Sequence, residues 1–139
     1  MKRRANTEIN KLKDKADRLL QDYYRLYCRN RNIKCMGCGG EMKLGHHFFE
    51  KSSSAGLRYE IKNLCPLCTS CHARHHLGGD PSIVANILYK KGKKWYNSLR
   101  KLKVEKKGVS LNKTFLLKQI DKWKKKIEQE KPTPDESVL

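Results

Sequence analysis

The chain has 139 residues, enough for one compact domain with extensions rather than for two separate cores. Lysine and arginine number 32 against 14 aspartate and glutamate, a formal net charge of +18 at pH 7, and repulsion of this size favours a polyanionic partner. No apolar run approaches the roughly 18 residues of a membrane-spanning helix, and the N-terminus does not have the pattern of a secretion signal. We therefore expect an intracellular, cytoplasmic protein that binds nucleic acid and not membrane.

Residues 1–32 are predicted to contain a basic leader, residues 1–6, followed by one amphipathic helix. From Thr7 onward, apolar residues recur at spacings of three and four, which places them on one helical face. The helix is predicted to end near Cys28. The apolar stripe consists of Ile9, Leu12, Ala16, Leu19, Tyr23 and Leu26.

Residues 33–80 are rich in glycine, cysteine and histidine, which is typical of a fold held together by metal. Two Cys-x-x-Cys pairs are separated by 29 residues. Each pair can present two thiolates to one ion, and together they complete the tetrahedral four-sulfur site that zinc favours. A redox pair and an iron–sulfur cluster are the alternatives, and Cys65 is either a substitute ligand or a small core residue. The predicted zinc ligands are Cys35, Cys38, Cys68 and Cys71.

The five histidines lie between these pairs or just beyond the second pair. If the second pair opens a helix, His72 and His76 share one helical face and can bind one cation. His46 and His47 are adjacent in a segment suited to a short strand, where neighbouring side chains point to opposite sides. We therefore expect one of these two to bind metal and the other to face a substrate.

Residues 81–130 are predicted to form basic helices and residues 131–139 a disordered tail. Asp80 and Pro81 are a typical helix start, because aspartate caps free N–H groups and proline at the first helical position loses no hydrogen bond. Prolines and acidic residues in the tail favour disorder. A last apolar stripe consists of Leu116, Ile120, Trp123 and Ile127.

Three segments together resemble the zinc-bearing HNH (His-Me finger, ββα-metal) endonuclease motif. They are Gly45 to Phe48, Asn63 to Cys68 and Cys71 to His76, which agree with the motif in residue type, order and spacing. The resemblance extends from Cys35 to about Pro81. It implies an α+β fold with a small ββα-metal core and a four-cysteine zinc, flanked by N-terminal and C-terminal helices.

The resemblance also implies roles for single residues. His47 would be the general base that takes a proton from the attacking water, and Asn63 would brace the loop that orients it. His46, His72 and His76 would hold one divalent cation, which would bind the scissile phosphate of DNA. Imidazole ligands favour Zn²⁺, Ni²⁺, Mn²⁺ or Co²⁺ over Mg²⁺, although selectivity is loose. His46 and His47 exchange these roles if the strand faces the other way.

A weaker resemblance, to phage NinG (Rap) recombination proteins, covers Lys15 to Leu26 and Lys91 to Tyr96. Those proteins often lack the doubled histidine and have asparagine where this chain has His72. This resemblance implies a phage-encoded nuclease that cuts branched DNA, such as a Holliday junction, in a bacterial host. Heptad spacing in the two apolar stripes suggests a homodimer, and the alternative is that the stripes pack within one chain.

Two other functions remain open: a homing, restriction or packaging-associated HNH nickase, and a zinc-ribbon DNA-binding protein without catalysis. The basic residues either contact DNA phosphates or form solvated faces. Arg58 either approaches the DNA backbone or pairs with Glu60, and His75 either contacts phosphate or lies on the surface. The candidate DNA contacts are Arg58, His75, Lys90, Lys91, Lys93, Lys94, Arg100 and Lys101.

Overall fold

The computed structural model of the chain describes residues 2–132, with side chains from residue 7 onward. From residue 133, the predicted disordered tail lies outside the described residues. The fold is α+β, as predicted, with a small antiparallel sheet and helices on either side of it in the sequence. In chain order the helices and strands are α1 (Lys2–Asn30), β1 (Leu44–His47), β2 (Leu64–Leu67), α2 (Thr69–Gly78), α3 (Pro81–Lys91), α4 (Lys93–Glu105) and α5 (Lys113–Glu130), with two short 3₁₀ turns, Ala55–Leu57 and Ile61–Asn63, before β2.

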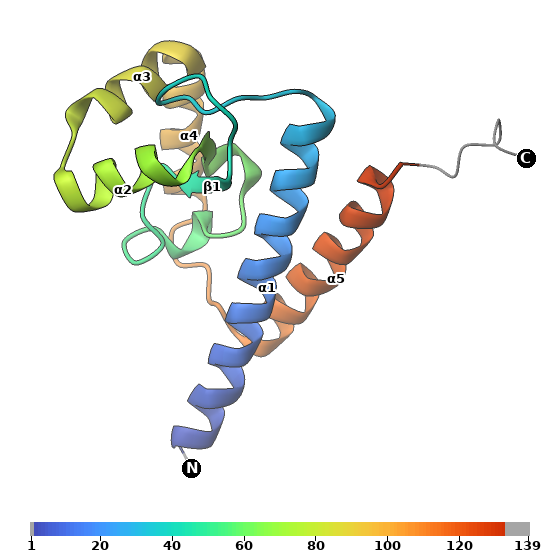
Figure 1. The fold of residues 1–139 in the computed structure, drawn as a ribbon. Coiled ribbons are helices and arrows are strands. Elements are labelled where there is room, and N and C mark those ends of the chain that lie inside the picture. Colours follow the sequence, from blue (N-terminus) through green and yellow to red (C-terminus); the bar gives the residue numbers. More distant parts are fainter. Residues whose placement is uncertain (1, 133–139) are drawn as a thin grey trace, which may run out of the picture.

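Helices α1 and α5 lie side by side and run in the same direction (Figure 1). Ion pairs join them at both ends: Lys113 with Glu8 at 2.9 Å, and Arg31 with Glu130 at 2.9 Å. Between these ends the apolar faces of the two helices form the larger core of the protein, which contains every residue of the two predicted stripes except Leu26. Its buried residues from the two helices are Ala16, Leu20, Tyr23, Tyr24, Cys28, Leu116, Ile120 and Trp123.

This packing bears on two expectations. Of the two alternatives for the apolar stripes, the structure shows packing within one chain, because burying both apolar faces together removes them from water. Helix α1 also begins at Lys2, so the basic residues expected to form a separate leader belong to the helix. It ends at Asn30, two residues beyond the predicted Cys28.

The smaller core joins the sheet, α2 and α3. Strand β1 pairs with β2 so that His46 lies opposite Cys65 and His47 opposite Leu64. Every residue of β2 is buried, and α2 follows it directly. Helix α3 begins as predicted, with the Asp80 side chain accepting the Ser82 N–H at 2.9 Å. The buried residues of this core are Cys35, Cys65, Leu67, Cys71, Ile83 and Ile87.

Helix α4 packs behind the loop that joins β1 to β2. The Trp95 indole donates a hydrogen bond to the Lys62 carbonyl at 2.9 Å, and its ring contacts Phe48 with 5.1 Å between centroids. Trp95 is therefore a half-buried packing residue, and Trp123 of α5 is a core residue that is 1% exposed. None of the helices within residues 2–132 combines the length and the apolar character needed to cross a lipid bilayer.

Candidate active site and metal centres

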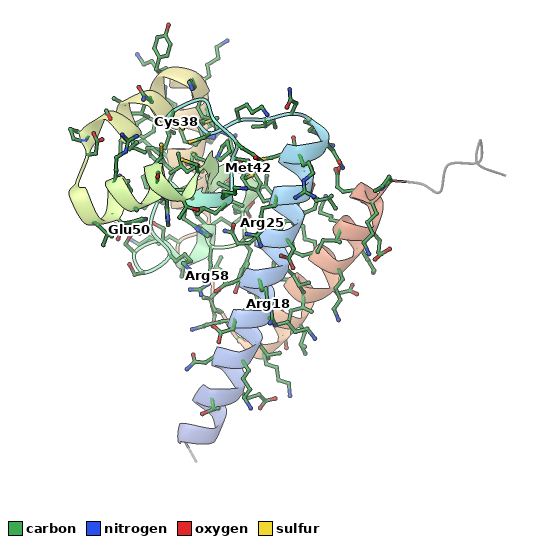
Figure 2. All side chains as sticks on the ribbon, in the orientation of Figure 1. Arg18, Arg25, Cys38, Met42, Glu50 and Arg58 are labelled. Carbon is green, nitrogen blue, oxygen red and sulfur yellow. The ribbon has the colours of Figure 1, made fainter. Side chains whose placement is uncertain are left out.

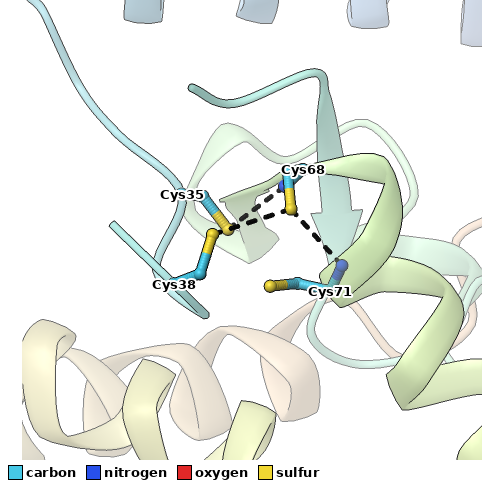
Figure 3. Close-up of side chains that lie close together, drawn as sticks. All are labelled: Cys35, Cys38, Cys68 and Cys71. Carbon is cyan, nitrogen blue, oxygen red and sulfur yellow. Dashed lines mark hydrogen bonds between the residues drawn. The ribbon is translucent and has the colours of Figure 1, made fainter. Parts of the chain in front are cut away.

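The four cysteines of the two Cys-x-x-Cys pairs come together at the start of α2. Their sulfur atoms all lie within 4.8 Å of one another, and Cys38 Sγ lies 3.8 Å from Cys68 Sγ. Figure 3 shows the side chains of the two pairs converging on one point. Zinc–sulfur bonds of about 2.3 Å in a tetrahedron separate the sulfurs by roughly 3.8 Å. The cluster therefore fits one tetrahedral metal ion.

Backbone N–H groups donate to three of these sulfurs, those of Cys35, Cys38 and Cys68, and they stabilise the thiolate of Cys35. Burial raises the pKa of the fourth, Cys71, to about 12. Cys35 Sγ accepts the N–H of Cys68 at 3.1 Å and of Gly37 at 3.3 Å. Burial alone would raise the pKa of Cys35, but these backbone donors outweigh it and lower the pKa to about 7. A thiol in this environment is ready to lose its proton to a metal ion.

The two remaining cysteines do not belong to this cluster. Cys65 is fully buried in the smaller core, and burial raises the pKa of its thiol to about 12. Cys28 lies in the larger core, on α1. Both behave as small apolar residues.

A second group of metal-binding side chains forms where β1 meets α2. One ring nitrogen from each of His46, His72 and His76 lies within 4.8 Å of the others. His72 and His76 lie one turn apart on α2, with 4.4 Å between their ring centroids, and His46 lies 5.3 Å from each. Three nitrogens at these separations can bind one divalent cation and leave positions for other ligands.

His46 is held in its neutral form. It is 4% exposed, and its burial, together with the neighbouring imidazoles, lowers its pKa to about 3. A neutral imidazole keeps a lone pair for a metal ion. His75 also contacts His46, with 4.9 Å between ring centroids, but it is not one of the three histidines whose nitrogens converge.

His47 has a different environment from its neighbour. Its Nε2 lies 2.9 Å from the backbone carbonyl of Arg58, which can only accept a hydrogen bond. The proton of the neutral ring therefore stays on Nε2, and Nδ1 is left with a free lone pair. Burial lowers the pKa of His47, which also favours the neutral ring.

Asn63 connects the loop after β1 to the start of β2. Its Oδ1 accepts the Phe49 N–H at 2.9 Å, and its Nδ2 donates to the Phe49 carbonyl at 3.0 Å. The Asn63 carbonyl accepts the Phe48 N–H at 2.9 Å. These three bonds, made by a residue with no exposed surface, fix the backbone that follows His47.

The histidines line a cleft of about 740 Å³ between α1 and α2. His46, His47, His72 and His76 all contribute to it, and Asp17, Gln21 and Arg25 of α1 form the opposite side. Figure 2 places Arg25 on α1 and Glu50 beside α2, at the two sides of this cleft.

Gln21 and Asp17 are site residues that the sequence did not identify. Gln21 pairs with both backbone groups of Gly45: it accepts the N–H and donates to the carbonyl, each at 2.8 Å. This contact needs glycine, because a Cβ at position 45 would lie 2.6 Å from the Tyr24 ring. Helix α1 therefore holds β1, the strand that carries His46 and His47, in place along the cleft.

Arg58 forms an ion pair with Asp17, a partner that was not predicted. Arg58 Nε donates to Asp17 Oδ1 at 2.9 Å, and its Nη2 donates to Oδ2. The predicted alternative partner, Glu60, instead lies 3.7 Å from Lys106. Because the Arg58 carbonyl accepts the hydrogen bond from His47, Asp17 is linked to His47 through one residue.

The other predicted DNA contacts are dispersed. Arg58 lines the cleft, and Arg100 lines a second groove formed with α4. The lysines predicted in α3 and α4 are not among the residues that line the cleft. Lys91 stacks on Trp95 at 5.4 Å, and the exposed ones are Lys90, Lys93, Lys94 and Lys101.

The segment that carries the two clusters of metal-binding side chains matches a known family. The family model described as HNH endonuclease matches residues 35–78, from the first cysteine of the cluster to the end of α2. The chain carries an HNH endonuclease domain. Neither the curated proteins nor the solved structures give a match to the chain.

The matched span contains both ligand clusters, His47 and Asn63. It leaves out α1, which supplies Asp17, Gln21 and Arg25 to the cleft. The cleft lined by the histidines of this HNH domain is thus completed by a helix that precedes the domain in the sequence.

Proposed function

We propose that this protein is a divalent-cation-dependent endonuclease that hydrolyses DNA phosphodiester bonds in the cleft between α1 and α2. The observation that carries the proposal is the different setting of two adjacent histidines. His46 turns to the two histidines of α2, whereas His47 is held by a backbone carbonyl in the same cleft. A metal ligand and a proton acceptor side by side are what metal-assisted hydrolysis requires.

In this proposal His47 is the general base. With its proton fixed on Nε2 by the Arg58 carbonyl, Nδ1 takes a proton from the attacking water. Asn63 keeps the following backbone in place, and Asp17 holds Arg58. Both are positioning residues.

His46, His72 and His76 would hold the catalytic cation, one of Mg²⁺, Mn²⁺, Ni²⁺ or Zn²⁺. When bound, such an ion binds the scissile phosphate and stabilises the charge on the leaving 3′ oxygen. The four cysteines would hold a separate structural zinc ion. The net charge of +18 supports a polyanionic substrate.

The finer part of the proposal is that the substrate is branched DNA, as for a phage-type recombination nuclease. It is supported by the resemblance of Lys15 to Leu26 and of Lys91 to Tyr96 to NinG proteins. One HNH site cuts one strand, so symmetric cleavage of a four-way junction needs two copies related by a two-fold axis. Because the α1 and α5 stripes cover each other, the two copies would meet on the DNA.

A supercoiled-plasmid assay tests the nuclease proposal. We expect no nicking without added divalent cation, nicking after Mn²⁺ is added, and 5′-phosphate ends that a ligase can reseal. A gel-shift assay on the same plasmid measures binding independently. DNA binding without nicking in any of the four cations would contradict the nuclease and favour a zinc-ribbon DNA-binding protein.

Cleavage mapping tests the finer proposal on linear, flapped, Y-shaped and four-way DNA, with light scattering of the protein alone and with the junction. We expect preferred cleavage of branched substrates and two copies on the junction. Equal nicking of all four substrates by a monomer would contradict branched-DNA specificity, and would favour a nickase of another biological role.

A further inference from the structure

A second groove, of about 590 Å³, lies beside the active-site cleft. One of its walls is the loop from Phe49 to Leu57, and the other is formed by α4 and the turn after it. Ser52 lines both this groove and the cleft, so the two adjoin at that residue. We call it the aromatic–basic groove, after its lining residues Phe49, Tyr96, Arg100, Lys103, Lys106 and Lys107.

The groove combines aromatic rings with cations. Phe49 and Tyr96 are half-buried, with 6.4 Å between their ring centroids. Lys103 Nζ lies 4.5 Å from the centre of the Phe49 ring, and Arg100 Cζ lies 5.7 Å from that of Tyr96. Among the described residues that line the groove, none is acidic.

The two walls are fixed to each other and to the loop that follows His47. Gly56 touches the backbone of Lys106 so closely that a Cβ there would meet the Lys106 carbonyl oxygen. Phe48 packs its ring against Tyr96 at 5.9 Å, behind the groove. Phe49 is held through its backbone by Asn63, the residue that braces the loop after His47. The position of the groove relative to the catalytic cleft is therefore set by the fold.

We propose that the aromatic–basic groove binds unpaired nucleotides of the DNA next to the phosphate that is cut. Aromatic rings for base stacking and cations for the phosphate backbone are the two components of single-strand binding sites. A duplex keeps its bases stacked inside, so it cannot offer their faces to Phe49 or Tyr96. The groove volume lies within the range of about 300–1,000 Å³ that holds small ligands, which suits one or two nucleotides.

This inference rests on the proposed function, and it gives that function a substrate class: DNA with a single-stranded segment beside the cut. Base stacking tolerates any sequence because every base has a π-face, so the aromatic–basic groove would read sequence weakly. Flaps, gaps and the open centre of a branch all present such nucleotides.

Binding of a fluorescent single-stranded oligothymidylate, compared with a blunt duplex of the same length, tests the groove without cleavage when no divalent cation is added. Replacing Tyr96 with leucine removes the stacking face but keeps an apolar side chain. We expect Tyr96→Leu to weaken single-strand binding by roughly 5- to 150-fold and to leave duplex binding within about twofold. Tyr96→Phe, which keeps the ring, should bind like the wild type.

Two variants that each remove one positive charge give a second test, which does not depend on whether Tyr96→Leu folds normally. Lys103→Gln removes a cation from the groove, and Lys118→Gln removes one from an exposed position on α5. Only Lys103→Gln should reduce the preference for single strands. Equal losses on single-stranded and duplex DNA for both Tyr96→Leu and Lys103→Gln would overturn the proposal. If single-strand binding depends on these residues but the wild type nicks no DNA with any cation, the groove stands and the nuclease proposal fails.

Discussion

The cysteine cluster and the histidine cluster share helix α2 but differ in their surroundings. Three of the four cysteine sulfurs accept backbone N–H groups, and Cys35 and Cys71 are buried in one cluster with Ile83 and Ile87 of α3. The histidines instead line an open cleft of about 740 Å³. Sites closed by protein ligands are typical of structural metal ions, and sites with an open position are typical of catalytic ones.

The comparison also shows how the two clusters depend on each other. Cys68 caps α2, Cys71 lies in its first turn, and His72 is the next residue. A metal ion bound by the cysteines would therefore fix the end of the helix that presents His72 and His76. We expect that losing a cysteine ligand also disables the histidine cluster, whereas losing a histidine ligand leaves the cysteine cluster intact.

The largest effect should follow from replacing a cysteine ligand. Cys35→Ala leaves three thiolates, and a structural zinc ion contributes on the order of 10 kcal/mol to the folding of such modules. We expect loss of bound zinc, loss of the cooperative unfolding transition of the domain, and no cleavage. Metal analysis and thermal unfolding measure this.

Cys65→Ala is the matched control, because Cys65 is a buried cysteine outside the cluster. It should keep one zinc ion per chain and remain folded. If Cys35→Ala is folded, lacks zinc and still cuts DNA, the histidine cluster does not depend on the cysteine cluster and the claim is contradicted.

A smaller effect should follow from replacing a histidine ligand. Loss of even an outer-shell partner typically weakens metal binding about 10- to 100-fold, so His72→Ala should raise the Mn²⁺ concentration for half-maximal cleavage at least about tenfold. Activity should partly recover at high Mn²⁺, while the zinc content stays at the wild-type level. An unchanged Mn²⁺ dependence would exclude His72 from the cation site.

The smallest of these effects should come from Asp17, which bonds to Arg58, the residue whose carbonyl holds His47. Asp17→Asn loses the charged pair with Arg58 and should lower kcat about tenfold by misplacing the Arg58 carbonyl. KM, the Mn²⁺ dependence and Tm should change little. Asp14→Asn, an exposed change on the same helix, is the control, and an equal response of both variants would contradict the positioning role.

The sequence predicted the features that depend on local spacing. The two Cys-x-x-Cys pairs meet in space, His72 and His76 share one face of α2, and α3 begins at Pro81. The α+β class was also predicted correctly, since the HNH resemblance included the order of its strands and helix.

Contacts between distant parts of the chain could not be predicted in this way. Gln21 meets Gly45 across 24 residues, and Arg58 meets Asp17 across 41. Both pairs depend on how α1 packs against the domain, and the spacing of residues along the chain does not predict that packing. The same applies to the apolar stripes, whose heptad spacing fits equally a partner chain and the partner helix that the structure provides.

The central claim is that His47 is the general base of a metal-dependent nuclease, and single-turnover cleavage by His47→Ala tests it most directly. We expect a loss of about 100-fold or more at saturating Mn²⁺, with zinc content, Tm and DNA affinity unchanged. Unlike the loss in His72→Ala, this one should not recover at higher Mn²⁺. Cleavage by His47→Ala at the wild-type rate would contradict the account.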